Sequence, residues 1–323
     1  VGAWACYLSL FASLLMLLGA ALAYHTLMSD FAYSLVNGAR GSEVDVGVWS
    51  RQTAPLIISL LLFPVTLAKE VKLLVRISSY GIFSVGFALV FIAYHAVVGV
   101  ESMPDSKISL TCPPASACIP LINQHWGDFA SLLPVSYFVH NCILPIVNHT
   151  GDPGKKIRNH AFGFWIVAAC YVFVGVLPFF AEIGPEGKIF PQNYLSLFDT
   201  FEPYALTTRV ALLWQLMTVY PLIVGIFRTQ FFGWTLNKQW PGFWRVFIHN
   251  TILVGFCTCM SAVYPNPGKV LGWVGALAGS IYVAILPILV HIMALRQDGK
   301  LTTASTVAHS CLSVFGVMLF CYG

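Results

Sequence analysis

Polar residues interrupt an apolar stretch near the middle of the chain. The run at residues 136–145 contains His140, Asn141 and Cys142, and leucine, isoleucine and valine flank it on both sides. A hydrocarbon environment offers no hydrogen-bond partner to an imidazole, to an amide or to backbone that is interrupted ahead of a proline. We therefore expect this run to face protein, water or a ligand, with His140, Asn141 and Cys142 as candidate ligand contacts.

A second apolar stretch, residues 213–228, carries Gln215, Thr218, Tyr220 and Pro221 near its middle. Many transporters build a binding site from two helices that are broken near the midplane, because unwound carbonyls and helix ends can coordinate an ion or an amino acid. The two stretches together predict such a site, to which Gln215, Thr218 and Pro221 contribute. Proline kinks also occur in ordinary helical bundles, so a purely structural role for each proline stays open.

The composition places both stretches in a membrane protein. Hydrophobic residues make up 58% of the 323 residues, charged residues only 9%, and the mean hydropathy is +0.78. A soluble domain of this length carries far more charge. The aromatic content of 14% fits the interfacial belts of a multi-spanning protein, and the net charge of +4 gives no reason to expect a nucleic-acid partner.

The elements that must position the polar stretches are membrane-spanning helices of about 20 apolar residues each. In one of them, small residues such as Gly275 and Gly279 predict close packing of helices. Another is short, since Pro64 and the charges from Lys69 onward limit it. The sequence predicts an all-α integral membrane bundle with nine spans, at residues 3–28, 54–69, 77–100, 129–148, 161–183, 207–230, 244–264, 270–295 and 302–322.

Lysine and arginine concentrate in alternate loops, which sets an expected orientation. Residue 1 then starts in the cytosol and Gly323 ends on the far side. Because Val1 is not methionine and the chain opens directly into a span, we expect a fragment of a longer protein. By the positive-inside rule the cytosolic loops are the basic set, at residues 69–76, 155–158, 228–245 and 296–300.

A loop at residues 101–128 holds two cysteines. Cys112 and Cys118 are separated by a short segment that begins with two prolines. In an oxidising compartment this spacing allows a disulfide between them. Two free thiols in a loop are the alternative.

Catalytic motifs are absent from the sequence. It contains no phosphate-binding loop, no His-Glu-x-x-His motif, no nucleophile elbow and no paired Cys-x-x-Cys motifs. We therefore expect no enzyme, no metal site and no organic cofactor. His25, His95 and His291 fall near span ends, where an interfacial position is expected. No acid lies at the centre of a predicted span, so carbonyls and helix ends would hold a cationic ligand.

Several segments resemble one known family. Residues 138–143, 209–222, 264–268 and 275–279 are similar to the amino acid and auxin permease superfamily, and within it to the solute carrier 38 family. The resemblance implies a leucine-transporter-like bundle of eleven spans with an inverted repeat. The nine predicted spans would be family spans 3 to 11. Residues 1–323 would then be a transporter domain that lacks the N-terminal cytosolic tail and the first two spans.

The resemblance is strongest to a lysosomal, arginine-sensing branch of that family. It implies export of amino acids such as arginine and leucine from the lumen, and signalling of luminal arginine to the TOR kinase pathway. Rag GTPases and Ragulator would bind the N-terminal tail. Carried over by position, Cys142, with Asn141 and His140, would contact the substrate, and Thr218 would bind Na⁺ as the coupling ion. Sodium-coupled relatives place that hydroxyl at a slightly different distance from the proline.

Two alternatives stay open. One is a plasma-membrane, sodium-coupled neutral amino acid carrier with the same fold, which sodium dependence and cell-surface labelling would reveal. The other is a receptor that binds an amino acid without moving it, which binding without flux would reveal. An ion channel is disfavoured, because the sequence has no filter-like repeat and no ring of acids.

Overall fold

The computed structural model describes residues 3–41, 45, 47–69, 72–101, 132–138, 153–182 and 193–322. The predicted ligand contacts His140, Asn141 and Cys142 lie outside the described residues. The same holds for the predicted cysteine pair Cys112 and Cys118.

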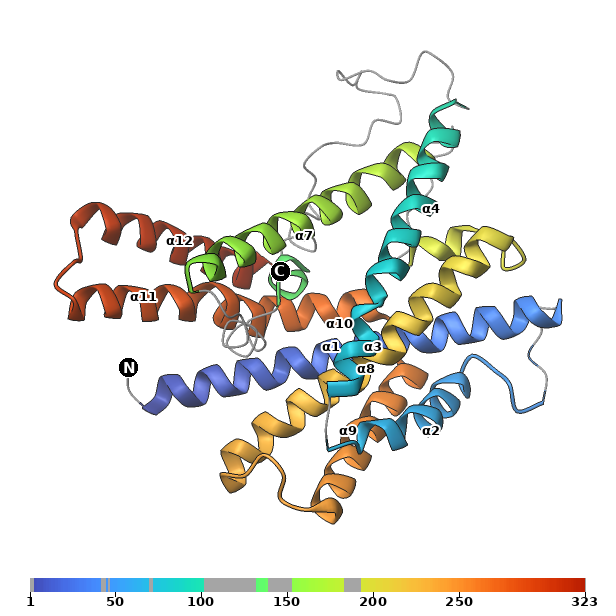
Figure 1. Cartoon of the computed structure of the whole chain (residues 1–323), viewed down its shortest axis with the longest axis horizontal. Helices are drawn as coiled ribbons and strands as arrows, with labels where there is room; N and C mark the ends of the chain where they lie inside the picture. Colours follow the sequence, from blue (N-terminus) through green and yellow to red (C-terminus); the bar gives the residue numbers. More distant parts are fainter. Residues whose placement is uncertain are drawn as a thin grey trace.

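The regular elements of the described chain are helices (Figure 1). In chain order they are α1 (Ala3–Arg40), α2 (Ala54–Thr66), α3 (Lys72–Ser79), α4 (Gly81–Glu101), α7 (Pro153–Glu182), the 3-10 helix η1 (Tyr194–Leu197), α8 (Pro203–Leu236), α9 (Phe243–Val263), α10 (Pro267–Val274), the π-helix η2 (Gly275–Ile285), α11 (Leu286–Gln297) and α12 (Thr303–Tyr322).

Six of the described helical segments are long and apolar enough to cross a membrane. They correspond to the predicted spans at 3–28, 77–100, 161–183, 207–230, 244–264 and 270–295. Two other helical stretches, Ala54–Thr66 and Thr303–Met318, are apolar but shorter. The predicted span at 129–148 falls mostly outside the described residues, where 132–136 form a short helical segment. The protein is therefore a multi-pass helical membrane protein, and nine spans remain a prediction.

Helix α1 is much longer than the span predicted at 3–28, so the predicted end was wrong. Its 38 residues correspond to a length of about 57 Å, against about 30 Å for the hydrocarbon core of a bilayer. Polar residues beyond position 28 do not stop the helix, because they are buried within the protein. Ser29 is 5% exposed and Asn37 is 2% exposed.

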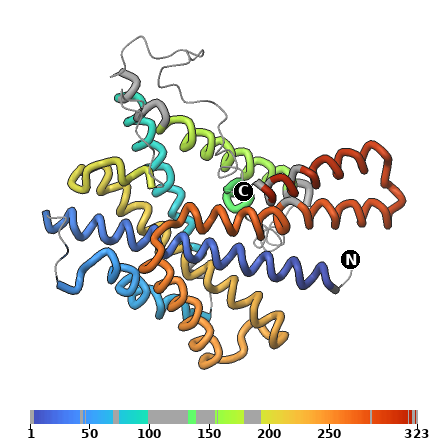
Figure 2. Tube along the Cα trace, turned by 180° about the vertical axis from the view of Figure 1, so that it is seen from behind, coloured from blue at the N-terminus to red at the C-terminus, as the bar shows by residue number. Residues whose placement is uncertain are grey.

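The main core lies where α1, α2, α8 and α9 meet. Helices α1 and α8 cross near the middle of the molecule in both views, and α2 and α9 lie together on one side of this crossing (Figures 1 and 2). The buried side chains that join them are Leu17, Ala21, Leu22, Met28 and Ala32 of α1, Ile58 and Leu62 of α2, Tyr220, Ile223 and Val224 of α8, and Leu253 and Cys257 of α9.

Helix α8 runs without interruption through Pro221, so the predicted break in the span at 207–230 is wrong. Proline removes one backbone donor, which would leave the carbonyl of Met217 without its usual helical partner. Such a loss is tolerated in membrane helices when neighbouring helices cover the site. Pro221 is almost completely buried, which explains why the helix continues.

The C-terminal end of α2 is held by side chains from two other helices. Arg228 of α8 donates to the carbonyls of Thr66 at 3.0 Å and Ala68 at 3.1 Å. Asn250 of α9 donates to the same Thr66 carbonyl at 2.9 Å. The last carbonyls of a helix have no partner within it, and these two residues supply one. They thereby fix α2 to α8 and α9.

Small residues allow α1 and the α10–η2 segment to approach closely, as the sequence predicted. A Cβ atom added at Gly19 of α1 would lie 2.7 Å from the side chain of Val274. A Cβ atom added at Gly279 of η2 would lie 2.7 Å from the Cβ of Pro134. Ser280 is fully buried, and its hydroxyl donates to the carbonyl of Gly275 at 3.4 Å.

The ends of the bundle agree with the predicted alternation of loops. The N-terminal end of α1 and the α11–α12 turn lie on the same side of the molecule, and the α1–α2 connection lies on the opposite side (Figures 1 and 2). The α11–α12 turn contains Arg296 and Lys300, which were predicted to share a side with residue 1. Gly299 reverses the chain there, with a φ of 66° that suits glycine.

The close approach of Gly279 in η2 to Pro134 leads to a testable prediction. We expect Gly279→Ala to lower the stability of the protein by about 1–3 kcal/mol, because the new methyl group meets the rigid ring of Pro134. Thermal unfolding of the purified protein in detergent measures the effect. Gly255→Ala in α9 is the matched control, since nothing lies within 4 Å of its Cβ position. Equal unfolding midpoints for the two variants would contradict the packing described here.

Candidate functional site

Three predicted site residues lie in the described part of the chain, on successive turns of α8. Thr218 is 7% exposed, and its hydroxyl donates to the carbonyl of Gln215 at 2.8 Å. Pro221 is buried one turn further on. A hydroxyl oxygen that donates its hydrogen keeps two lone pairs. Thr218 can therefore still accept a hydrogen bond or coordinate a cation.

Gln215 packs against the first residue of α4. A Cβ atom added at Gly81 would coincide with the Gln215 carboxamide, so only glycine leaves room for this contact. The Gln215 amide oxygen is buried and has no hydrogen-bond partner among the described residues. An unsatisfied buried acceptor is costly, which marks this position as one where a ligand or another polar group is expected.

The entrance to the polar run at 136–145 is also fixed by described contacts. The hydroxyl of Tyr171 in α7 donates to the carbonyl of Ser136 at 2.6 Å. The ring of Phe138 lies 5.9 Å from the ring of Tyr282 in η2. Both contacts place the start of the run between α7 and η2. Whether His140, Asn141 and Cys142 approach Thr218 stays a prediction.

A polar cluster that the sequence analysis missed lies in the core. We name it the His25 cluster, and it consists of His25 and Thr26 of α1, Ser59 of α2, and Thr258 and Ser261 of α9. His25 Nε2 lies 2.7 Å from the hydroxyl of Ser59, and His25 Nδ1 lies 3.0 Å from that of Ser261. His25 is completely buried. The prediction of an interfacial His25 is therefore wrong.

The cause of that error is the misplaced end of the first span. With the end set at residue 28, His25 lies one turn from the membrane surface, whereas in the 38-residue α1 it lies well inside the helix. The partners of His25 sit 34 and 236 residues away in the sequence. A hydroxyl in an apolar helix gives no sign of which distant side chain it meets, so only the fold could reveal the cluster.

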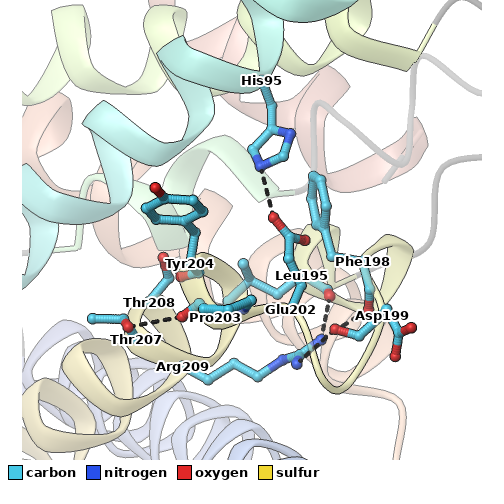
Figure 3. Close-up of polar contacts among 10 residues, drawn as sticks. All are labelled: His95, Leu195, Phe198, Asp199, Glu202, Pro203, Tyr204, Thr207, Thr208 and Arg209. Carbon is cyan, nitrogen blue, oxygen red and sulfur yellow. Dashed lines mark hydrogen bonds and ion pairs between the residues drawn. The ribbon is translucent and has the colours of Figure 1, made fainter.

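A second polar group surrounds Arg209 at the start of α8 (Figure 3). The Arg209 guanidinium is 3% exposed, and Nη2 donates to the carbonyls of Leu195 at 2.8 Å and Phe198 at 3.1 Å. Nη1 lies 3.5 Å from the carbonyl of Asp199. The Arg209 cation thus holds the η1 segment against the start of α8.

An ion-pair contact joins α4 to the same region. His95 Nε2 lies 3.4 Å from a carboxylate oxygen of Glu202, and both side chains are partly buried (Figure 3). The His95 ring also packs on Phe198 at 4.3 Å and on Phe91 at 4.5 Å. His95 lies in the last two turns of α4, as its predicted position near a span end required.

The chemistry that these groups offer is binding rather than bond making. They present hydroxyls, amides and carbonyl oxygens, which hold small polar ligands and hard cations. Within the described ranges no three His, Cys, Asp or Glu residues gather in a way that could hold a metal ion. A buried polar position on a membrane-crossing helix, such as Thr218 of α8, is a common feature of helical membrane transport proteins.

The sequence family described as transmembrane amino acid transporter protein matches residues 1–323, and the chain belongs to this family. Among its relatives is the "sodium-coupled neutral amino acid transporter 9 homolog" of Caenorhabditis elegans, 31% identical over 292 residues, which are 88% of this chain and 46% of the relative. The "neutral amino acid transporter 9" of Danio rerio is 29% identical over 300 residues, which are 91% of this chain and 53% of the relative.

A more distant relative is the "sodium-coupled neutral amino acid symporter 2" of Danio rerio, which is 22% identical over 269 residues, 75% of this chain and 51% of the relative. The chain spans about half the length of the curated relatives it matches. The family and these relatives are transporters rather than enzymes. The resemblance noted in the sequence is thereby confirmed.

The hydrogen bonds from Arg209 to the backbone carbonyls lead to a testable prediction. Arg209→Lys keeps the charge but loses the planar fork that reaches several carbonyls at once. We expect it to lower stability by about 1.5–3 kcal/mol, the usual cost of one hydrogen bond made by a charged group. Thermal unfolding in detergent measures the loss. Arg245→Lys on the exposed N-terminal turn of α9 is the control, and an equal loss in both variants would show that the three carbonyls are not held by Arg209.

Proposed function

We propose that this chain is the membrane domain of a lysosomal, arginine-responsive amino acid transporter, which exports amino acids from the lumen. The single observation that carries the proposal is the family match over residues 1–323. The similarity to proteins named neutral amino acid transporter 9 supports amino acids as the substrates. The lysosome, arginine and the TOR kinase pathway come from the resemblance described above.

The proposed mechanism is alternating access in a leucine-transporter-like, inverted-repeat bundle of nine spans. Its fixed part is the group α1, α2, α8 and α9, which share one core and are joined by Arg228, Asn250 and the His25 cluster. The proposed site is made by residues of the polar run at 136–145 together with residues of α8, in the manner of transporters whose substrate sites lie near the midplane.

The proposed substrate contacts are His140, Asn141 and Cys142 on the run, together with Gln215, Thr218 and Pro221 on α8. The buried amide oxygen of Gln215, which has no hydrogen-bond partner among the described residues, supports this assignment. Thr218 is the proposed ligand for Na⁺ as the coupling ion, because it is buried and its lone pairs can coordinate a cation. Carbonyl oxygens and helix ends hold the guanidinium group of arginine.

Signalling is a further part of the proposal. In this proposal Rag GTPases and Ragulator bind an N-terminal cytosolic tail outside residues 1–323. The basic loops on the side of residue 1 face the cytosol, where these partners reside.

A plasma-membrane, sodium-coupled neutral amino acid carrier is the second candidate. The similarity to a protein named sodium-coupled neutral amino acid symporter 2 favours it. A receptor that binds an amino acid without moving it is the third. Cell-surface labelling, sodium replacement and a comparison of binding with flux distinguish these candidates from the first.

The deciding experiment uses the full-length protein in proteoliposomes. Radiolabelled arginine and leucine uptake is measured with and without Na⁺, beside vesicles that contain Cys142→Trp. Uptake that the tryptophan abolishes supports the proposal. Absence of flux for both amino acids, with Cys142→Trp indistinguishable from the unmodified protein, would overturn it. Binding without flux would favour the receptor.

The contact between Gly81 and the Gln215 carboxamide leads to a testable prediction. Gly81→Ala should displace the Gln215 carboxamide, because the new methyl group occupies its place. We expect about tenfold weaker apparent affinity for the transported amino acid, which corresponds to about 1.4 kcal/mol. Substrate-concentration dependence of uptake gives the affinity. Gly86→Ala on the same helix is the matched control, since nothing lies within 4 Å of its Cβ position. Equal affinities in the two variants would remove Gln215 from the site.

A further inference from the structure

The hydrogen-bond directions in the His25 cluster can be worked out from the chemistry of hydroxyl groups. Each serine or threonine hydroxyl has one hydrogen to donate and two lone pairs that accept. A carbonyl oxygen can only accept. Wherever a threonine hydroxyl is bonded to a carbonyl, its only hydrogen is used there, and every other hydrogen bond to that hydroxyl must be donated to it.

One chain of hydroxyls leaves His25 through Ser59. Thr258 donates to the carbonyl of Val254 at 2.8 Å. Its hydroxyl is also hydrogen-bonded to that of Ser59, and while Thr258 keeps its bond to the carbonyl, Ser59 is the donor in this pair. The Ser59 hydrogen is then used, and the 2.7 Å contact between Ser59 and His25 Nε2 requires a hydrogen on Nε2.

A second chain leaves the other side of the ring through Ser261. Thr26 donates to the carbonyl of Leu22 at 2.9 Å. The hydroxyls of Thr26 and Ser261 lie 2.9 Å apart, and while Thr26 keeps its bond to the carbonyl, Ser261 donates to Thr26. The Ser261 hydrogen is then used, and the 3.0 Å contact with His25 Nδ1 requires a hydrogen on Nδ1.

Both ring nitrogens carry hydrogen only in the imidazolium form of histidine. We propose that His25 is a buried proton-binding site, in which two hydroxyl chains directed away from the ring stabilise the protonated imidazole between α1, α2 and α9. The site goes beyond the proposed transport function and does not depend on it, because it is a property of the scaffold helices whether or not the chain moves an amino acid.

The neutral ring is also accommodated without an unsatisfied group. When Nε2 loses its proton, Ser59 turns to donate to Nε2 and Thr258 turns to donate to Ser59. The carbonyl of Val254 loses only the side-chain bond, since it also accepts the helical backbone bond of α9. The Ser261 chain can reverse in the same way. Binding or release of a proton therefore needs only the rotation of two hydroxyl groups. It leaves no polar group of the cluster without a partner.

The other titratable groups around the ring carry no formal charge at neutral pH. Tyr220 of α8 has its ring 5.7 Å from that of His25, and Cys257 of α9 belongs to the same core. On α1 itself, Asp30 pairs with Arg51. Charged groups and other titratable groups on the helices packed against α1 are engaged or exposed elsewhere: Arg209 with the η1 carbonyls, Arg228 with the end of α2, His249 with Asn250, Tyr282 with Phe138, and Arg245 and Lys269 exposed. The hydroxyl chains are thus what offsets the cost of the buried cation.

The test follows the protonation state of the ring directly. The full-length protein, labelled with ¹⁵N-histidine in detergent, is examined by NMR from about pH 8 to about pH 5, the range in which histidine ordinarily titrates. His25→Gln identifies the resonances of His25 by their loss. If this variant does not fold, Ser261→Ala identifies them by their shift. We expect both ring nitrogens to pass reversibly between the neutral and the doubly protonated pattern while the protein stays folded.

A matched pair of variants tests the role of the hydroxyl chain. Thr258→Val removes the acceptor for the Ser59 hydrogen and so favours the neutral ring, in which Ser59 donates to Nε2. We expect the His25 titration midpoint to fall by about one pH unit, a tenfold lower proton affinity. Thr251→Val is the control, because Thr251 is an exposed residue of α9 that makes the same kind of bond to a carbonyl, that of Phe247.

Two results would overturn the proposal. The first is a His25 ring that keeps one nitrogen unprotonated over the whole pH range in the folded protein. The second is an equal titration midpoint for Thr258→Val and Thr251→Val, which would show that the chains do not stabilise the cation. Neither readout involves amino acid flux, so a failure here is separate from a failure of the proposed transport function.

Discussion

Hydrogen-bonding groups that have no access to water must find partners within the protein, and this requirement organises the bundle. A helix satisfies its own interior backbone but leaves its terminal carbonyls open. At the end of α2 those carbonyls are taken by Arg228 and Asn250, and at η1 by Arg209. Buried threonines donate back to their own helix, as Thr258 does to Val254. The polar residues therefore join particular helices, and apolar surface is left for lipid.

The distribution of these polar contacts divides the molecule into parts held in different ways. Side-chain hydrogen bonds connect α1, α2, α8 and α9 at several depths, in addition to their shared apolar core. Helix α7 is mostly exposed, with Trp165 75% exposed, and the hydroxyl of Tyr171 joins it to the carbonyl of Ser136. Contacts that are few or purely apolar are the ones that can break and re-form during a conformational change. Helices α1, α2, α8 and α9 are therefore the natural scaffold.

Hydropathy predicted most of the spans, because membrane insertion depends on the average character of about 20 residues. It placed the end of the first span wrongly, since Ser29 and Asn37 look like loop residues until the helices that cover them are known. It also misjudged Pro221, whose effect depends on burial rather than on residue type. The close packing at Gly279 could be predicted, because a residue without a side chain lets a neighbouring segment approach the helix backbone. The partners of His25 and Arg209 could not, because pairing is a property of the fold.

Helix α8 connects the candidate substrate site to the His25 cluster. Thr218 and Tyr220 are two residues apart, which turns their side chains about 200° from each other around the helix axis. Thr218 therefore lies on the face that carries the predicted site, while Tyr220 packs against His25 on the opposite face. A change in the charge of His25 can reach the site through Tyr220 and α8. The shared core of α8 with α1, α2 and α9 opposes movement of α8 alone, so the scaffold must adjust together if the two sites are coupled.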